Sequence, residues 1–108
     1  KTWGEVYPTG VSGSPPHLML HSSGALICSY GRRQRPCGER AMVSYDFGKT
    51  WEDDYVLHNT KNEDDWDLGY PSTVELDDGS LMTVYYQKYE DDEKCSMLYT
   101  KWQLEEKK

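Results

Sequence analysis

The fold of this chain is decided by the stretch Ser44-Tyr45-Asp46-Phe47-Gly48-Lys49-Thr50-Trp51. Its pattern is S-x-D-x-G-x-T-W, with small polar and glycine positions between aromatic ones. The carboxylate of Asp46 can accept hydrogen bonds from backbone N–H groups of a turn, and Gly48 can adopt the left-handed conformation that a tight turn needs. Trp51 offers a large ring that can pack between layers. We therefore expect a structural turn between two β-strands, formed by Ser44, Asp46, Gly48, Thr50 and Trp51.

The sequence on both sides of this turn consists of short apolar runs separated by turn residues. Asp77-Asp78-Gly79 is one such separator, and Asp-Gly between runs rich in β-branched or aromatic residues is a strong hairpin signal. The runs alternate with the period of strands rather than helices. They predict an all-β fold with strands near His17–His21, Ala25–Tyr30, Arg40–Ser44, Asp54–His58, Ser72–Leu76, Ser80–Tyr86 and Cys95–Lys101.

An internal repeat organises these strands. Pro16–Leu26 can be placed over Pro71–Leu81 with coincident Pro, Gly and Leu residues, at an offset of 79 − 24 = 55 residues. Without a gap, the same offset places Met42 on Met97. A period of this size belongs to the range of β-propeller blades, each of which is a four-stranded antiparallel sheet. The repeat therefore predicts a partial propeller of about two blades.

The repeat divides the chain into parts of a single propeller fragment. Residues 1–10 would end a preceding blade, residues 11–60 would form a first blade, and residues 61–108 a second, incomplete blade. Lys1-Thr2-Trp3 repeats Lys49-Thr50-Trp51, so we expect Trp3–Tyr7 to be the outer strand of the preceding blade. Because a blade cannot bury its faces alone, we also expect a homo-oligomer.

Composition and charge exclude several classes of partner. The formal net charge of the 108 residues is −7, and the only basic cluster is the segment with Arg32, Arg33, Arg35 and Arg40. Nucleic-acid binding usually needs a basic stripe, so no nucleic acid is expected as a partner. No apolar run approaches the roughly 18 residues that span a bilayer, so no membrane is expected either.

The three cysteines, Cys28, Cys37 and Cys95, are odd in number and have no C-x-x-C spacing. This pattern supports neither a disulfide framework nor a zinc site. A Cys37–Cys95 disulfide is compatible with the expected topology and stays open. We expect no metal and no cofactor.

The S-x-D-x-G-x-T-W stretch resembles the Asp box of sialidases and of the wider family of bacterial neuraminidase repeats. Residues 67–86 are similar to blade openings of bacterial sialidase-like proteins, and so are residues 15–18 and 27–33. The similarity covers nearly the whole chain, from about Pro15 to Trp102. The resemblance implies a partial sialidase-like β-propeller with about two four-stranded antiparallel blades. The Asp box indicates the fold and not a reaction.

In sialidases the active site lies on the rim opposite the Asp boxes. Strand alternation places the connections at 9–16, 31–39, 60–70 and 87–94 on that second rim. The family hydrolyses glycosides with an arginine cluster for the substrate carboxylate, a Tyr nucleophile with a Glu partner, and an Asp acid/base. The resemblance therefore implies a carbohydrate ligand at this rim.

Arginines are the first candidate ligand-binding residues, because the planar guanidinium binds a carboxylate with two hydrogen bonds. The resemblance points to Arg33 and Arg40, with Arg35 and Arg32 behind them. Pairing with the abundant acidic residues is the alternative role of these side chains.

Four further residues complete the candidate site, each with a structural alternative. Asp67 would be a catalytic acid/base, or would cap its own loop. Tyr70 would be a catalytic nucleophile or a sugar contact, or would pack beside Pro71. His17 and Trp66 would contact a ligand, or His17 would hold the blade entrance and Trp66 would cover a blade edge.

Two departures from the family limit the function that the resemblance implies. The chain has no Arg-Ile-Pro opening, and two blades cannot supply an arginine triad, an acid and a nucleophile from separate blades. We therefore expect a sialidase-like glycan-processing or glycan-binding module that is not catalytically complete as a monomer. The alternative is a non-enzymatic, lectin-like or structural repeat protein that oligomerises.

Overall fold

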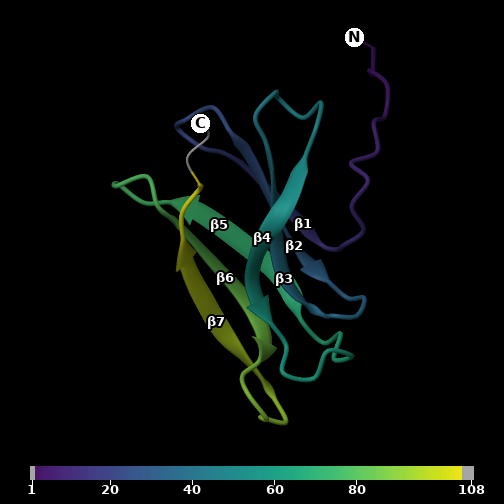
Figure 1. Cartoon of the computed structure of the whole chain (residues 1–108), viewed down its shortest axis with the longest axis vertical. Helices are drawn as coiled ribbons and strands as arrows, with labels where there is room; N and C mark the ends of the chain where they lie inside the picture. Colours follow the sequence, from purple (N-terminus) through teal and green to yellow (C-terminus); the bar gives the residue numbers. More distant parts are fainter. Residues whose placement is uncertain (1, 106–108) are drawn as a thin grey trace.

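The computed structural model describes residues 2–105, the side chains of Asp53 and Asp54 excepted. Within these residues the chain is all β, as the sequence predicts, with seven strands in two antiparallel sheets and no helix. This part of the chain accordingly has no helix that could cross a bilayer. The strands, labelled in Figure 1, are β1 (Pro16–Leu20), β2 (Leu26–Arg32), β3 (Gly38–Ser44), β4 (Glu52–Asn59), β5 (Gly69–Glu75), β6 (Leu81–Lys88) and β7 (Cys95–Trp102).

The first sheet has the strand order β1-β2-β3-β4, and the second has the order β5-β6-β7. The β1–β2 and β5–β6 turns have the same construction. Gly24 and Gly79 both have positive φ angles, 93° and 85°, which favour glycine. The N–H of Gly24 donates to the carbonyl of His21, and the N–H of Gly79 donates to that of Leu76. The two hairpins therefore begin in the same way.

The strand boundaries differ from the expected ones by up to three residues. β3 begins at Gly38, two residues earlier than expected, because the β2–β3 ladder continues until Arg32 pairs with Gly38. β5 begins at Gly69, three residues early, because Gly69 pairs with Tyr86 beyond an irregularity in the ladder. These longer strands extend the sheets into the connections that are expected at the second rim.

The two sheets pack face to face, and the main core lies between them. Its buried members are Ala25, Ile27, Ala41, Val43, Leu57 and Leu81. Burying one such aliphatic side chain contributes about 1.5–3 kcal/mol. β5 packs against β1 and β2, whereas β4 and β7 approach each other at the rings of Tyr55 and Trp102, whose centroids are 5.1 Å apart.

A line of hydroxyl groups crosses this core. Ser29 Oγ lies 2.9 Å from Thr73 Oγ1, which in turn lies 2.7 Å from Thr83 Oγ1. Trp102 Nε1 donates to Thr83 Oγ1 at 2.9 Å. These polar groups are tolerated in the interior because they satisfy one another.

The pairing of strands shows which residues of the two sheets are equivalent in the internal repeat. Leu18 pairs with Cys28 in the first sheet, and Thr73 pairs with Thr83 in the second. The offset is 73 − 18 = 55 for the first strand of each pair and 83 − 28 = 55 for the second. β1 and β2 therefore correspond to β5 and β6 at the offset that the sequence indicates.

The third strands correspond at a different offset. Cys28 pairs with Met42, whereas its counterpart Thr83 pairs with Thr100, so β3 corresponds to β7 at 100 − 42 = 58 residues. The expected superposition of Met42 on Met97 is therefore wrong by three residues. The reason is that the β6–β7 hairpin is three residues longer than the β2–β3 hairpin, and a comparison without gaps cannot detect this.

The segment before β1 is not a strand. Trp3 and Val6 are 100% and 93% exposed, and Figure 1 shows this segment running away from the sheets. The described residues therefore do not form the expected outer strand at Trp3–Tyr7, because no neighbouring strand receives its backbone hydrogen bonds. Further along, Val11 packs against the outer face of the first sheet.

The three cysteines are free thiols. Cys28 and Cys37 are buried, and Cys95 is half-buried at the start of β7. The Cys37–Cys95 disulfide that the sequence left open is therefore not formed. Burial raises the pKa of all three thiols above its ordinary value, which favours the protonated form.

Candidate binding site on the loop rim

Three connections lie toward the lower end of the molecule in Figure 1, away from the β3–β4 turn. We call the segments 31–38, 60–70 and 88–95 the loop rim. Cys37 N donates to the carbonyl of Glu63 at 2.9 Å, and Thr60 N donates to the carbonyl of Cys37 at 3.1 Å. Ser14 N donates to the carbonyl of Gly31 at 3.0 Å, which adds the segment before β1. The backbone thus holds these connections together.

The opposite rim carries the S-x-D-x-G-x-T-W turn, whose polar side chains hydrogen-bond to one another and to the backbone of the same turn. Asp46 Oδ1 accepts from Ser44 Oγ and from Thr50 N, both at 2.8 Å, and Asp46 Oδ2 accepts from Thr50 Oγ1 at 2.7 Å. Hydrogen bonds from Thr50, and then from Ser44, lower the pKa of Asp46 to about 2. Gly48 has φ 91°, and Trp51 packs against the outer face of the first sheet. These contacts give all five residues structural roles.

Four side chains meet on the loop rim around the hydroxyl group of Tyr86. The carboxylate of Asp67 and the guanidinium of Arg33 both lie close enough to this hydroxyl to shift its pKa. The ring of Tyr70 lies beside that of Tyr86, with centroids 5.8 Å apart. Burial raises the pKa of Tyr86, Arg33 lowers it, and Asp67 raises it further, so the phenol stays protonated. We call these four residues the rim cluster.

The backbone at Gly69 and Tyr70 shapes the rim cluster. Arg33 Nε and Nη2 donate to the carbonyl of Leu68 at 3.2 and 2.9 Å, and a Cβ atom at Gly69 would lie only 3.1 Å from Arg33 Nη2. Gly69 also has φ 136°. Tyr70 has φ 50°, a conformation that costs a non-glycine residue about 1 kcal/mol or more. This strained turn leaves the Tyr70 side chain 70% exposed beside the cluster.

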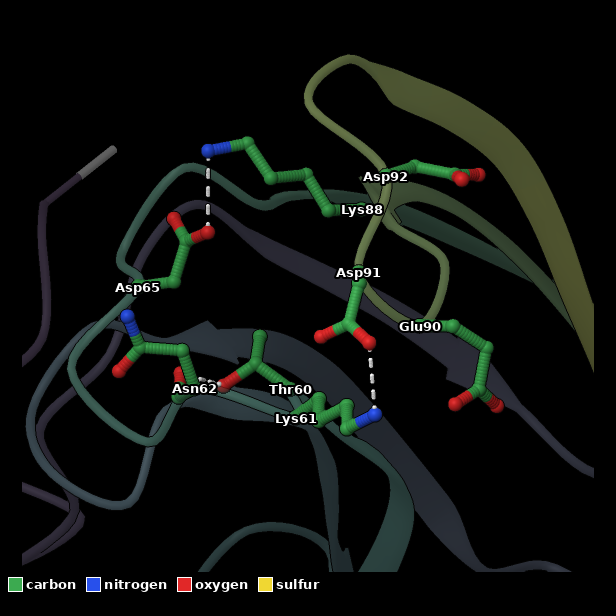
Figure 2. A pocket seen from close by; sticks show the side chains of 8 residues that line it. All are labelled: Thr60, Lys61, Asn62, Asp65, Lys88, Glu90, Asp91 and Asp92. Atoms are coloured by element: carbon green, nitrogen blue, oxygen red, sulfur yellow. Dashed lines mark hydrogen bonds and ion pairs between the residues drawn. The ribbon is translucent and has the colours of Figure 1, made fainter.

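A polar pocket of about 220 Å³ also lies on the loop rim (Figure 2). Its lining residues come from the β4–β5 and β6–β7 connections, and they are Thr60, Lys61, Asn62, Asp65, Lys88, Glu90, Asp91 and Asp92. Two ion pairs hold it: Lys88 Nζ lies 3.0 Å from Asp65 Oδ2, and Lys61 Nζ lies 2.8 Å from Asp91 Oδ2. Figure 2 shows these pairs within the pocket. Alternating donors and acceptors of this kind suit a ligand rich in hydroxyl groups.

The other three predicted arginines are engaged elsewhere. Arg32 Nη2 donates to the carbonyl of Arg35 at 3.2 Å. Arg40 is buried, and it donates to the carbonyl of Pro36 at 3.2 Å. Arg35 pairs with Glu63 and Asp64, each at 3.1 Å. The structure therefore brings only Arg33 of the four into the rim cluster, and Arg35 has the alternative role of pairing with acidic residues.

The structure also separates His17 from Trp66. His17 Nδ1 accepts a hydrogen bond from Thr73 N at 3.2 Å, so His17 joins β1 to β5 and has the structural role. Trp66 is 63% exposed on the β4–β5 connection, immediately before Asp67. Its ring is therefore accessible to a ligand on the loop rim.

Sequence reasoning missed Tyr86 of the rim cluster and the buried residue Glu39. Glu39 is 0% exposed, and neither of its carboxyl oxygens has a hydrogen-bond partner within residues 2–105. Burial raises the pKa of Glu39 to about 8, although Arg33 and Arg40 oppose the rise. The sequence does contain a signal for the burial of Glu39. Side chains alternate between the two faces along β3, so Glu39 lies on the same face as the core residue Ala41.

Metal binding finds no support in the described part of the chain. In residues 2–105, no three or more His, Cys, Asp or Glu side chains are grouped so that they could hold a metal ion.

Comparison with known proteins gives one informative likeness. No family model and no curated protein matches the chain. A crystal structure of a protein of unknown function from Dyadobacter fermentans DSM 18053 is similar, with a TM-score of 0.75 and 25% sequence identity. The match covers 92% of this chain and 27% of that one, so the chain spans about a quarter of the length of its neighbour. The likeness supports an all-β fold of two antiparallel sheets and names no activity.

Proposed function

We propose that the two sheets are successive blades of a sialidase-like β-propeller and that the loop rim binds a carbohydrate. The register supports the blade interpretation, because β1 and β2 correspond to β5 and β6 at an offset of 55 residues. The Asp46 turn, which resembles an Asp box, and the face-to-face packing of the sheets add to it. In the neighbour from Dyadobacter fermentans, the matching part is 27% of the chain, so a unit of this fold stands there within a larger protein.

One observation carries the binding proposal: Arg33 and Asp67 lie beside the hydroxyl of Tyr86, whose ring contacts that of Tyr70, on the loop rim. Exposed aromatic rings, here Tyr70 and Trp66, can cover the apolar face of a sugar, and the polar groups can bind its hydroxyls. Arg33 has five N–H groups. Two of its nitrogens, Nε and Nη2, donate to the Leu68 carbonyl, and other N–H groups remain for a ligand. The remaining N–H groups of the exposed Arg33 carry its positive charge, so they favour an acidic sugar over a neutral one.

Binding is better supported than catalysis. Arg35 and Arg40 are engaged away from the rim cluster, so the described residues supply one arginine for a substrate carboxylate rather than a set of three. The raised pKa of Tyr86 disfavours the phenolate that a nucleophile would need. The chain is therefore proposed to bind glycans without completing a glycosidase site.

Glycoside hydrolysis is the second candidate, and the proximity of the Asp67 carboxylate to the Tyr86 hydroxyl favours it. In that case the phenol oxygen of Tyr86 would attack the anomeric carbon while the glycosidic bond breaks. Asp67 would accept the phenol proton and pass it to the departing alcohol, and water would then hydrolyse the glycosyl–Tyr86 bond. Tyr86 would then replace Tyr70 as the nucleophile.

Calorimetric titration of the chain with N-acetylneuraminic acid and with galactose tests the binding proposal. Arg33→Gln is expected to weaken binding of the acidic sugar about tenfold or more, because a charge-assisted hydrogen bond contributes about 1.5–3 kcal/mol. Arg35→Gln is the matched control, since Arg35 is engaged by Glu63 and Asp64. Equal losses for both sugars, or for both variants, would contradict the assignment of Arg33.

Release of fluorophore from a fluorogenic sialoside separates the two candidates. Binding without release supports the glycan-binding module. Release that Tyr86→Phe abolishes supports hydrolysis. If the chain neither binds nor releases either sugar, both functions are wrong and the chain is a structural repeat.

A further inference from the structure

The outer face of the second sheet is apolar and uncovered. Val74, Val84, Met97 and Tyr99 point away from the first sheet and are 53%, 38%, 75% and 65% exposed. Exposed apolar side chains that gather on one face of a sheet usually mark an interaction surface. We call these four residues the open face of the second sheet.

The register relates this open face to a face that is already covered. At the offsets of 55 and 58 residues, Val84 corresponds to Ser29 and Tyr99 corresponds to Ala41. Ser29 and Ala41 are 0% exposed, because the second sheet packs over them. The open face is therefore the counterpart of the surface with which the first sheet receives its neighbour.

The outer face of the first sheet also has a counterpart in the second sheet, namely the face that packs against the first sheet. Leu18 and Leu20 on β1 are 59% and 61% exposed, and Leu18 lines a groove of about 370 Å³ together with Met42 and Trp51. Leu18 corresponds to Thr73, which is 3% exposed and packed against the first sheet. This surface is therefore the counterpart of the one that the second sheet presents to the first.

We propose that the open face of the second sheet docks the outer face of the first sheet of a second copy of this chain. The docking would reproduce between copies the sheet-to-sheet contact within one copy, and it rests on the proposed succession of blades. Each copy has both surfaces, so the contact is head to tail. Such a contact can close into a ring of copies and leave no apolar sheet face open.

The internal contact also predicts which side chains meet. Ser29 Oγ and Thr73 Oγ1 lie 2.9 Å apart across the two sheets of one copy. Val84 is the counterpart of Ser29, and Leu18 is the counterpart of Thr73. Val84 of one copy should therefore lie against Leu18 of the next.

Disulfide trapping tests this pair. Leu18→Cys and Val84→Cys are made separately in a background with Cys28→Ala, Cys37→Ala and Cys95→Ser. The background is needed because Leu18 pairs directly with Cys28. A cross-linked dimer is expected when the two variants are mixed and oxidised. A mixture of Leu18→Cys with Gln103→Cys, on an exposed residue after β7, should give at most a trace.

Light scattering of the natural sequence at micromolar concentration gives the second readout. A mass of two or more copies is expected, and Val84→Glu should reduce it to one copy, whereas Gln103→Glu should leave it unchanged. A monomeric natural sequence, or a mass that Val84→Glu does not change, would overturn the docking. Sugar titration of the same samples keeps the two tests apart. A natural sequence that is monomeric and still binds sugar would refute the docking and leave the binding site intact.

Discussion

Glu39 and His58 pair directly across the β3–β4 ladder, yet the Glu39 carboxyl group has no hydrogen-bond partner within residues 2–105. A ring nitrogen of His58, Nδ1, instead lies 2.5 Å from Nε2 of Gln87 on the second sheet. Gly31 pairs with Glu39 on the other side and offers no side chain. A buried carboxyl group without a hydrogen-bond partner favours the neutral form, because Arg33 and Arg40 offset only part of the cost of burying its charge.

The stability of the chain should therefore fall as the pH rises toward 8. Glu39 has a pKa of about 8 in the folded chain and an ordinary value of 4.5. The folded state thus binds more protons between these values, so the stabilisation is complete below pH 4.5 and is lost by about pH 8. The shift corresponds to a loss on the order of 5 kcal/mol. Urea unfolding measured from pH 5 to 9 checks it, and Glu39→Gln should remove most of the slope. A flat profile for the natural sequence would contradict the buried neutral acid.

Asp46 should produce the opposite dependence at low pH. Its pKa is lowered to about 2, so its stabilisation is present above the ordinary value of 3.8 and is lost as the pH falls through about 2. Asp46→Ala should lower the melting temperature at pH 7 and leave sugar binding by the folded fraction unchanged. Asp77→Ala, on an exposed residue of the β5–β6 turn, is the control and should melt like the natural sequence. Loss of sugar binding at unchanged melting temperature would show that the turn is a ligand site.

Gly13 should resist substitution, because the segment before β1 packs closely on Tyr30. A Cβ atom at Gly13 would overlap the Tyr30 ring and lie 3.1 Å from the carbonyl oxygen of Gly31. Gly13→Ala should therefore lower the free energy of unfolding by about 1–3 kcal/mol, the usual cost of overpacking. Gly4→Ala is the matched control, since nothing lies within 4 Å of that position. Equal stability of the two variants in urea would mean that the segment does not pack there.

The sequence predicted the strands and could not predict the contacts of the loop rim. Turn chemistry at Gly24 and Gly79 is local, so the hairpins and their offset of 55 residues were readable from the chain. The longer β6–β7 hairpin was not, because its length depends on pairs such as Lys88 with Cys95 that leave no local signature.

The contacts of the arginines at the candidate site could not be predicted from the sequence either. Arg33, Arg35 and Arg40 are alike in sequence, and only long-range contacts separate them. Arg33 reaches the carbonyl of Leu68, 35 residues away, whereas Arg40 is buried against the carbonyl of Pro36. Alternation along a strand gives the face of a residue and not the partner that it meets.

The most direct test of the proposed function is a nuclear magnetic resonance titration of the ¹⁵N-labelled chain with N-acetylneuraminic acid. Amide shifts are expected to change at Arg33, Asp67, Tyr70 and Tyr86, in the rim cluster, and to stay constant over residues 44–51. The same titration of Arg33→Gln should lose these changes at matched sugar concentration. Shift changes confined to residues 44–51, or no change anywhere at millimolar sugar, would contradict a carbohydrate site on the loop rim.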